Sequence, residues 1–205
     1  MHIAVAGNIG CGKTTLTTRL SRHYGWKAEF EPVENNPYLA DFYQDMPTWA
    51  FHLQVFFLHS RFRQMTRIMQ DAGSTVQDRT IYEDAHIFAA NLHQNGILTN
   101  RDYQNYRSLY DSMIEYITPP DLLIYLRADM GTLVAQIEKR GREFERSIRI
   151  DYLKSLNQQY EKWISDYGKS KLLVVDVSKL DFVGRQEDFA YIVEGIDREL
   201  YGLFR

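Results

Sequence analysis

Short runs rich in β-forming residues alternate along this chain with longer segments of helical periodicity. The runs that predict strands are residues 2–6, 27–31, 74–78, 121–126 and 171–176. Four of them are nearly continuous apolar runs, as expected for strands that helices cover on both faces, whereas the run at 27–31 alternates. The segments expected to be helical are residues 13–24, 48–70, 82–95, 100–117, 130–140, 148–166 and 186–201. We therefore predict a doubly wound α/β fold with five parallel strands in the order 2-3-1-4-5.

Length and composition indicate one domain over residues 1–205. Hydrophobic residues make up 44% of the chain and charged residues 25%, a globular mixture that excludes wholesale disorder. The net charge of -3 gives no support to binding a nucleic-acid polymer, and the chain has no apolar run of the length that a membrane span needs. The single cysteine, Cys11, cannot form an internal disulfide, which predicts a reducing, cytoplasmic location.

The segment GNIGCGKT at residues 7–14 matches the spacing G-x-x-x-x-G-K-[ST] between a predicted strand and a predicted helix. Its glycines allow a tight turn whose N–H groups point at phosphate oxygens, and the helix N-terminus adds partial positive charge. Lys13 adds a full charge, and the Thr14 hydroxyl is a ligand for Mg²⁺. This P-loop predicts a nucleoside triphosphate site formed by Gly7, Asn8, Ile9, Gly10, Cys11, Gly12, Lys13, Thr14 and Thr15.

Glu31 ends the second predicted strand and precedes Pro32. Because the carboxyl ends of parallel strands meet at the ligand crevice, a carboxylate there lies beside the P-loop and is placed to act as a general base. Such a base is needed when the phosphoryl acceptor is a hydroxyl, whereas a nucleoside monophosphate is already anionic. The alternative interpretation is a surface glutamate that caps a loop.

Asp78 and Arg79 end the third predicted strand. The carboxylate suits the metal side of a triphosphate site, and the arginine suits the acceptor oxygen or the transferring phosphoryl group. An ordinary ion pair at a strand exit is the alternative interpretation. Asp176, at the end of the fifth predicted strand, is a competing candidate for the metal side.

The segment 51–62 predicts a buried helix that nevertheless contains Gln54 and Arg61 on one face. A buried glutamine suits the edge of a nucleobase, and a buried arginine requires a carboxylate, for which Asp84 is a candidate. An internal polar network without a ligand is the alternative.

Further along, residues 138–147 predict a short lid whose arginines screen phosphate charge. The alternative interpretation of this segment is a solvated helix end.

The GTPase class is excluded, because the near matches to its two further motifs, at 178–181 and 181–184, share Asp181. Two other classes stay open beside a hydroxyl kinase. One is a thymidylate-type nucleoside monophosphate kinase, and the other is a nucleotide-binding module without catalysis.

Taken together in this order and spacing, the motifs resemble the deoxynucleoside kinases, in particular the bacterial deoxyadenosine/deoxyguanosine kinase branch. The resemblance covers nearly the whole chain, through GNIGCGKTT, EPVENNPYLADFY, the helix with Gln54 and Arg61, DRTIYED, RGREFE and DVSKLDFV. It implies ATP- and Mg²⁺-dependent phosphorylation of the 5′-hydroxyl of a deoxyribonucleoside, with deoxyadenosine or another purine deoxynucleoside preferred. It also implies a homodimer.

On the acceptor side, the resemblance implies that Glu31 is the general base, that Arg79 contacts the 5′ oxygen and that Asp78 lies on the Mg²⁺ side. Further roles implied for the acceptor pocket are nucleobase recognition, base selectivity and contact with the sugar 3′-hydroxyl. The matching residues are Gln54 for the nucleobase, Arg61 and Asp84 for selectivity, and Tyr43 with Glu145 for the sugar.

On the donor side, Arg140 and Arg142 match lid arginines, and residues 176–184, with Asp181 and Phe182, resemble the loop that holds the adenine. Three features depart from the wider family. The tryptophan often found soon after E-P-V is replaced by Asn35, Asn36 and Pro37, as in the bacterial branch. Thr80 stands where a serine is usual after the D/E-R pair, and Gln136 stands where many relatives carry another lid arginine.

Overall fold

The structure, a computed structural model, describes residues 1–30, 36–142, 145 and 148–202. Within these residues five parallel strands form one sheet in the order β2-β3-β1-β4-β5, which confirms the predicted topology. The strands are β1 (His2–Gly7), β2 (Lys27–Glu29), β3 (Thr75–Asp78), β4 (Leu122–Arg127) and β5 (Lys171–Asp176).

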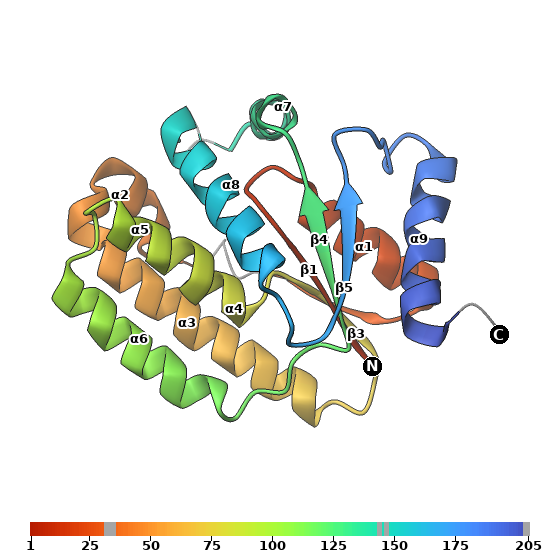
Figure 1. The fold of residues 1–205 in the computed structure, drawn as a ribbon, viewed down its shortest axis with the longest axis horizontal. Helices are drawn as coiled ribbons and strands as arrows, with labels where there is room; N and C mark the ends of the chain where they lie inside the picture. The colour runs from red at the N-terminus through yellow and green to blue at the C-terminus, as the bar shows by residue number, and fades with distance from the viewer. Residues whose placement is uncertain (31–35, 143–144, 146–147, 203–205) are drawn as a thin grey trace.

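Helices cover both faces of the sheet (Figure 1). Those that pack directly on it include α1 (Lys13–Tyr24), α8 (Ile150–Ser165) and α9 (Gln186–Tyr201). Successive side chains of β1 point to opposite faces. Ile3 and Val5 therefore pack with α1 and α9, whereas Ala4 and Ala6 pack with α8. β1 is buried on both sides, as its apolar run predicts.

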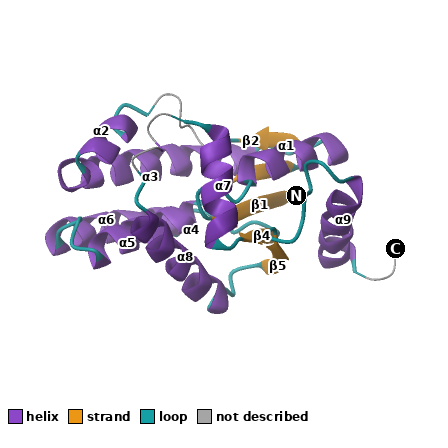
Figure 2. Cartoon of the chain, turned by 90° about the horizontal axis from the view of Figure 1, so that it is seen from above, coloured by secondary structure: helices purple, strands orange, loops and turns teal. Residues whose placement is uncertain are grey.

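The remaining helices form a bundle beside the sheet and a cover above it (Figure 2). They are α2 (Leu39–Gln44), α3 (Met46–Gln70), α4 (Ile81–Glu83), the π-helix η1 (Asp84–Ala89), α5 (Ala90–Gln94), α6 (Asn100–Ile114) and α7 (Met130–Arg140). The helices α3, η1 and α6 share a core that contains Leu58, Ala85 and Tyr106. Above the carboxyl ends of β1 and β4 lies α7, close to the P-loop (Figure 1).

The structure differs from the sequence prediction in four features. β2 ends at Glu29, so the strand predicted over 27–31 is shorter, and residue 31 lies outside the described residues. The helical segment predicted over 82–95 is confirmed, but its middle, η1, is a π-helix, because apolar spacing alone does not distinguish an α-helix from a π-turn. The helix α2 was not predicted at all. Finally, β5 lies at the sheet edge, and Val174 is 40% exposed rather than covered.

Among the described residues, no helix has both the length and the apolar character that crossing a bilayer requires.

Candidate active site

The P-loop lies between β1 and α1 and turns through glycines with positive φ angles. Gly12 has φ 95, and a Cβ there would come within 2.9 Å of the Phe182 ring, so glycine is required for both conformation and space. The Lys13 ammonium donates to the carbonyl oxygens of Gly7 at 2.8 Å and Asn8 at 2.9 Å. The Asn8 side chain ties the loop to α8 by donating to the Leu153 carbonyl. The loop is therefore held in a turned conformation from both sides.

Cys11 lies within this loop but faces the apolar core rather than the open side. Burial raises the pKa of its thiol, which keeps the group protonated. It is a packing residue.

Asp78 at the end of β3 meets the P-loop directly. The Thr14 hydroxyl donates to Asp78 Oδ2 at 2.6 Å. Asp78 is buried, and its other oxygen, Oδ1, has no hydrogen-bond partner within the described residues. The competing candidate, Asp176, accepts from the Ser178 amide and pairs with Lys179 instead. The geometry therefore favours Asp78, and not Asp176, beside Thr14.

Arg79 follows in a strained conformation, with φ 69. A left-handed backbone costs a non-glycine residue about 1–2 kcal/mol, and such strain concentrates at functional sites. The guanidinium lies 4.3 Å from the centre of the Phe88 ring and is 7% exposed. The main chain is fixed by the Arg79 amide, which donates to Val5 on β1.

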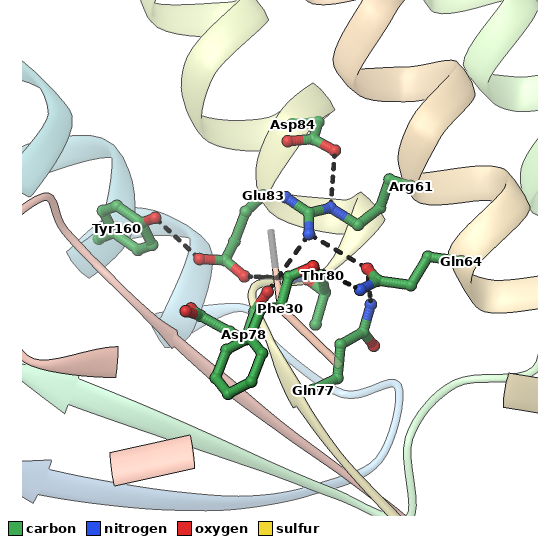
Figure 3. Close-up of polar contacts among 9 residues, drawn as sticks. All are labelled: Phe30, Arg61, Gln64, Gln77, Asp78, Thr80, Glu83, Asp84 and Tyr160. Atoms are coloured by element: carbon green, nitrogen blue, oxygen red, sulfur yellow. Dashed lines mark hydrogen bonds and ion pairs between the residues drawn. The ribbon is translucent and has the colours of Figure 1, made fainter. Parts of the chain in front are cut away.

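Glu83, which sequence reasoning missed, braces this strained turn (Figure 3). Its carboxylate is fully buried and accepts from the Thr80 amide at 2.7 Å, the Tyr160 hydroxyl at 2.8 Å and the Gly7 amide at 3.3 Å. It thereby joins the first residue of the P-loop to the Arg79 turn. The T-x-x-E spacing of a helix capping box at 80–83 was the available signal.

A cavity of about 470 Å³ opens beside these groups. Its size suits a nucleoside, and its walls mix aromatic with polar side chains. The lining residues are Ile9, Lys13, Thr14, Thr18, Phe30, Leu39, Phe42, Tyr43, Leu53, Gln54, Phe57, Asp78, Arg79, Asp84, Phe88, Arg140, Arg142, Glu145 and Tyr152. Thus several of the predicted P-loop, acceptor and lid residues line one cavity. Sequence reasoning missed Phe30 and Tyr152 as parts of its wall.

The polar residues of the buried helix lie at two depths. Gln54 lines the cavity and is 2% exposed, and its Oε1 lacks a partner among the residues that the structure describes. Arg61 pairs with Asp84 at 3.4 Å, which confirms the predicted ion pair. However, Asp84 lines the cavity and Arg61 does not. The arginine therefore reaches the site through the carboxylate that it holds.

The predicted lid residues are already tied together. Arg140 donates to Glu145 from Nε at 3.0 Å, and its Nη2 also contacts that carboxylate. The Arg142 guanidinium lies 3.7 Å from Glu145. Glu145 is buried, and both Glu145 and Tyr43, the residues expected to contact the sugar, line the cavity.

The predicted donor loop packs against the P-loop from the other side. The Phe182 ring covers Gly12, and Arg19 of α1 donates to the Phe182 carbonyl. Asp181 shapes the loop by accepting from the amides of Val183 and Gly184. A second cavity, lined by Thr14, Thr15, Thr18, Arg19, Arg22, His23, Val183 and Phe189, adjoins this loop. This second cavity shares Thr14 and Thr18 with the first.

Comparison with known proteins decides the family. The family model described as deoxynucleoside kinase matches residues 3–201. The chain belongs to the deoxynucleoside kinase family.

Relatives within the deoxynucleoside kinases agree over almost their full length. The chain is 39% identical to a deoxyadenosine/deoxycytidine kinase of Bacillus subtilis, over 95% of this chain and 90% of the relative. It is 35% identical to a deoxyguanosine kinase of the same organism, over 93% of each. A solved structure of deoxyadenosine kinase from M. mycoides, with the products dCMP and a flexible dCDP bound, superposes with a TM-score of 0.87. It is 30% identical, over 96% of this chain and 99% of that chain.

One predicted site residue of this deoxynucleoside kinase, Glu31, lies outside the described residues. The described chain reaches the site as far as Phe30, which lines the cavity.

Proposed function

We propose that this deoxynucleoside kinase transfers the terminal phosphoryl group of ATP to the 5′-hydroxyl of deoxyadenosine in preference to other deoxynucleosides. The observation that carries the proposal is the single cavity that joins Lys13 and Thr14 of the P-loop to Gln54 and Asp84. A nucleoside held by its base at one end presents its 5′-hydroxyl toward the triphosphate at the other. Such positioning supplies much of the catalysis of phosphoryl transfer.

The residues present fit a magnesium ion. Hard oxygen donors suit Mg²⁺, which keeps several waters and relies on substrate phosphates. The hydroxyl of Thr14 and the buried carboxylate of Asp78, whose Oδ1 has no partner in the described part of the chain, would hold it or its waters. When bound, the ion neutralises charge on the triphosphate.

We assign the chemical roles as follows. Glu31 accepts the proton of the 5′-hydroxyl, and Lys13 and Arg79 stabilise the negative charge of the transferring phosphoryl group. Arg140 and Arg142 line the same cavity and add positive charge from the lid.

The base preference rests on Asp84. Its carboxylate only accepts hydrogen bonds, so it suits a base that carries an exocyclic amine. Adenine and cytosine both carry such an amine, as the name of the Bacillus relative reflects, whereas thymine does not. The unpartnered Gln54 Oε1 adds a second acceptor toward the same base.

We also propose that the protein is a homodimer and that it is located in the cytoplasm. The single, buried cysteine supports the cytoplasmic location.

A coupled assay of ADP release tests the function. With ATP and Mg²⁺, we expect turnover with deoxyadenosine first, less with deoxycytidine and deoxyguanosine, and least with thymidine, and none with the four monophosphates. Release with monophosphates alone would identify a monophosphate kinase instead. Release no faster than the background with every acceptor would identify a nucleotide-binding module. Lys13→Met, which removes the P-loop charge, is the inactive control.

Replacing Gln54 by methionine should separate stability from function. Because methionine removes a buried acceptor without a partner, we expect the free energy of unfolding to rise by about 1 kcal/mol. The value of kcat/KM for deoxyadenosine should fall by about 10- to 100-fold, since the base loses a positioned hydrogen bond. Urea unfolding and steady-state kinetics measure both effects. A variant that is less stable yet fully active would show that Gln54 serves only the core.

A further inference from the structure

The side chain of Gln64 belongs to a buried polar network with Arg61 and Gln77 (Figure 3). It belongs to α3, is 2% exposed and does not line the cavity. Its Oε1 accepts from Arg61 Nη1 at 3.2 Å and from Gln77 Nε2 at 3.0 Å. Its Nε2 donates to the Phe30 carbonyl at 2.9 Å.

These partners fix the orientation of the amide. Guanidinium nitrogens only donate, so Oε1 must face Arg61, and a carbonyl only accepts, so Nε2 must face Phe30. A methionine at this position would satisfy neither partner. A glutamate would satisfy Arg61 but not Phe30.

Each of the two amide atoms of Gln64 forms one arm of contacts, and each arm leads to a residue that lines the cavity. On one arm, Arg61 holds Asp84, which lines the cavity and is proposed to accept from the nucleobase. On the other arm, Phe30 itself lines the cavity at the end of β2. The Gln64 amide therefore links two parts of the cavity wall, Asp84 and Phe30, that belong to separate elements.

We propose that Gln64 is a positioning residue that determines nucleoside selectivity, by holding Arg61, and through it Asp84, in register with the Phe30 wall. This inference rests on the proposed role of Asp84. Loss of Gln64 removes one of the acceptors that orient Arg61, so the Asp84 carboxylate loses a fixed position opposite the base. The value of kcat/KM should then fall more for a nucleoside whose base carries an exocyclic amine than for thymidine.

The chain offers a matched control in Gln77. It is fully buried, belongs to β3 and is part of the same network, but its side chain contacts Gln64 and His2 rather than a residue that lines the cavity. Replacing it should disturb the core about as much as replacing Gln64, without removing the contacts of Gln64 with Arg61 and Phe30.

The experiment compares kcat/KM for deoxyadenosine with kcat/KM for thymidine, at saturating ATP, in the full-length protein. This ratio does not depend on the fraction of folded enzyme. We expect Gln64→Met to lower the ratio about 10-fold, as for one positioned hydrogen bond, and Gln77→Met to change it by less than about twofold. Gln64→Glu should lower the ratio less than Gln64→Met does, because a carboxylate still accepts from Arg61, whereas the donor to Phe30 and Glu29 is lost.

An unchanged ratio in Gln64→Met, or an equal change in Gln77→Met, would overturn the proposal. If Gln64→Met does not fold, Gln64→Asn replaces it, since the shorter amide cannot reach both partners. Failure of the proposed function is distinguishable, because the wild-type protein would then show no turnover of deoxynucleosides. An Asp84→Ala variant with wild-type selectivity would instead show that the role of Asp84 is wrong.

Discussion

Replacing Glu31 by glutamine is expected to lower kcat for deoxyadenosine by about 100-fold or more, the range that a general base supplies. The amide keeps the size of the side chain but cannot take up the proton of the 5′-hydroxyl. The values of KM for ATP and for deoxyadenosine should change much less, because the P-loop and the base-contacting residues stay intact. Single-turnover kinetics with ATP and deoxyadenosine measure the chemical step directly.

Glu29→Gln is the matched control for this variant. Glu29 lies two residues earlier, at the end of β2, and forms ion pairs with Lys27 at 3.0 Å and Arg67 at 3.6 Å. Glu29 Oε2 also accepts from the Gln64 amide at 3.5 Å, a contact that a glutamine oxygen can keep. None of these partners lines the cavity, so kcat should stay within about twofold. Full turnover by Glu31→Gln would mean that another group takes the proton.

Arg79→Lys should lower kcat by about 100- to 1000-fold, because lysine cannot reproduce the planar donor fork that meets the transferring phosphoryl group. The ammonium retains the charge, so the loss measures geometry rather than electrostatic attraction alone. We expect nearly normal KM values for ATP. Steady-state kinetics under saturating Mg²⁺ give both quantities.

Two further variants test whether Arg79 is held under strain. Arg79→Ala and Arg79→Gly lose the same contact with Phe88, but only glycine adopts φ 69 without steric cost. The glycine variant should therefore be the more stable of the two in urea unfolding, although both lack activity. A more stable alanine variant would show that the turn relaxes and carries no strain.

The sheet could be predicted from the sequence because the residue pattern of each strand reflects which of its faces are buried. Apolar runs such as DLLIYL at 121–126 signal burial on both faces, and the βα alternation signals parallel order. The π-helix could not be predicted, since Asp84–Ala89 keeps an ordinary helical pattern of apolar residues. The exposure of Val174 depends on where the covering helices end, which no local pattern encodes.

Some residues of the candidate site could also be predicted from the sequence, and others could not. The P-loop was predictable because its chemistry is local, and the pairing of Arg61 with Asp84 followed from the cost of burying a charge. The depth of Arg61 was not predictable, because seven helical residues advance about 10 Å, enough to separate a wall residue from one behind it. Gln64 was missed because partners such as Phe30 are distant in sequence. Glu83 has a local partner in Thr80, but the contact with Gly7 that ties it to the P-loop spans 76 residues.

The strand order also partitions the chemistry. Phe30 follows β2 and Asp84 follows β3, on one flank of the P-loop strand β1, whereas Arg140 and Phe182 follow β4 and β5 on the other flank. Under the proposed roles, the nucleobase is recognised from the β2 and β3 half of the sheet and the donor adenine from the β4 and β5 half, whereas Glu145, which follows β4, serves the sugar of the acceptor. Mutations that change the choice of nucleobase can therefore accumulate while affinity for the triphosphate persists. A lineage of such enzymes can change which nucleosides it salvages without changing its phosphoryl-donor site.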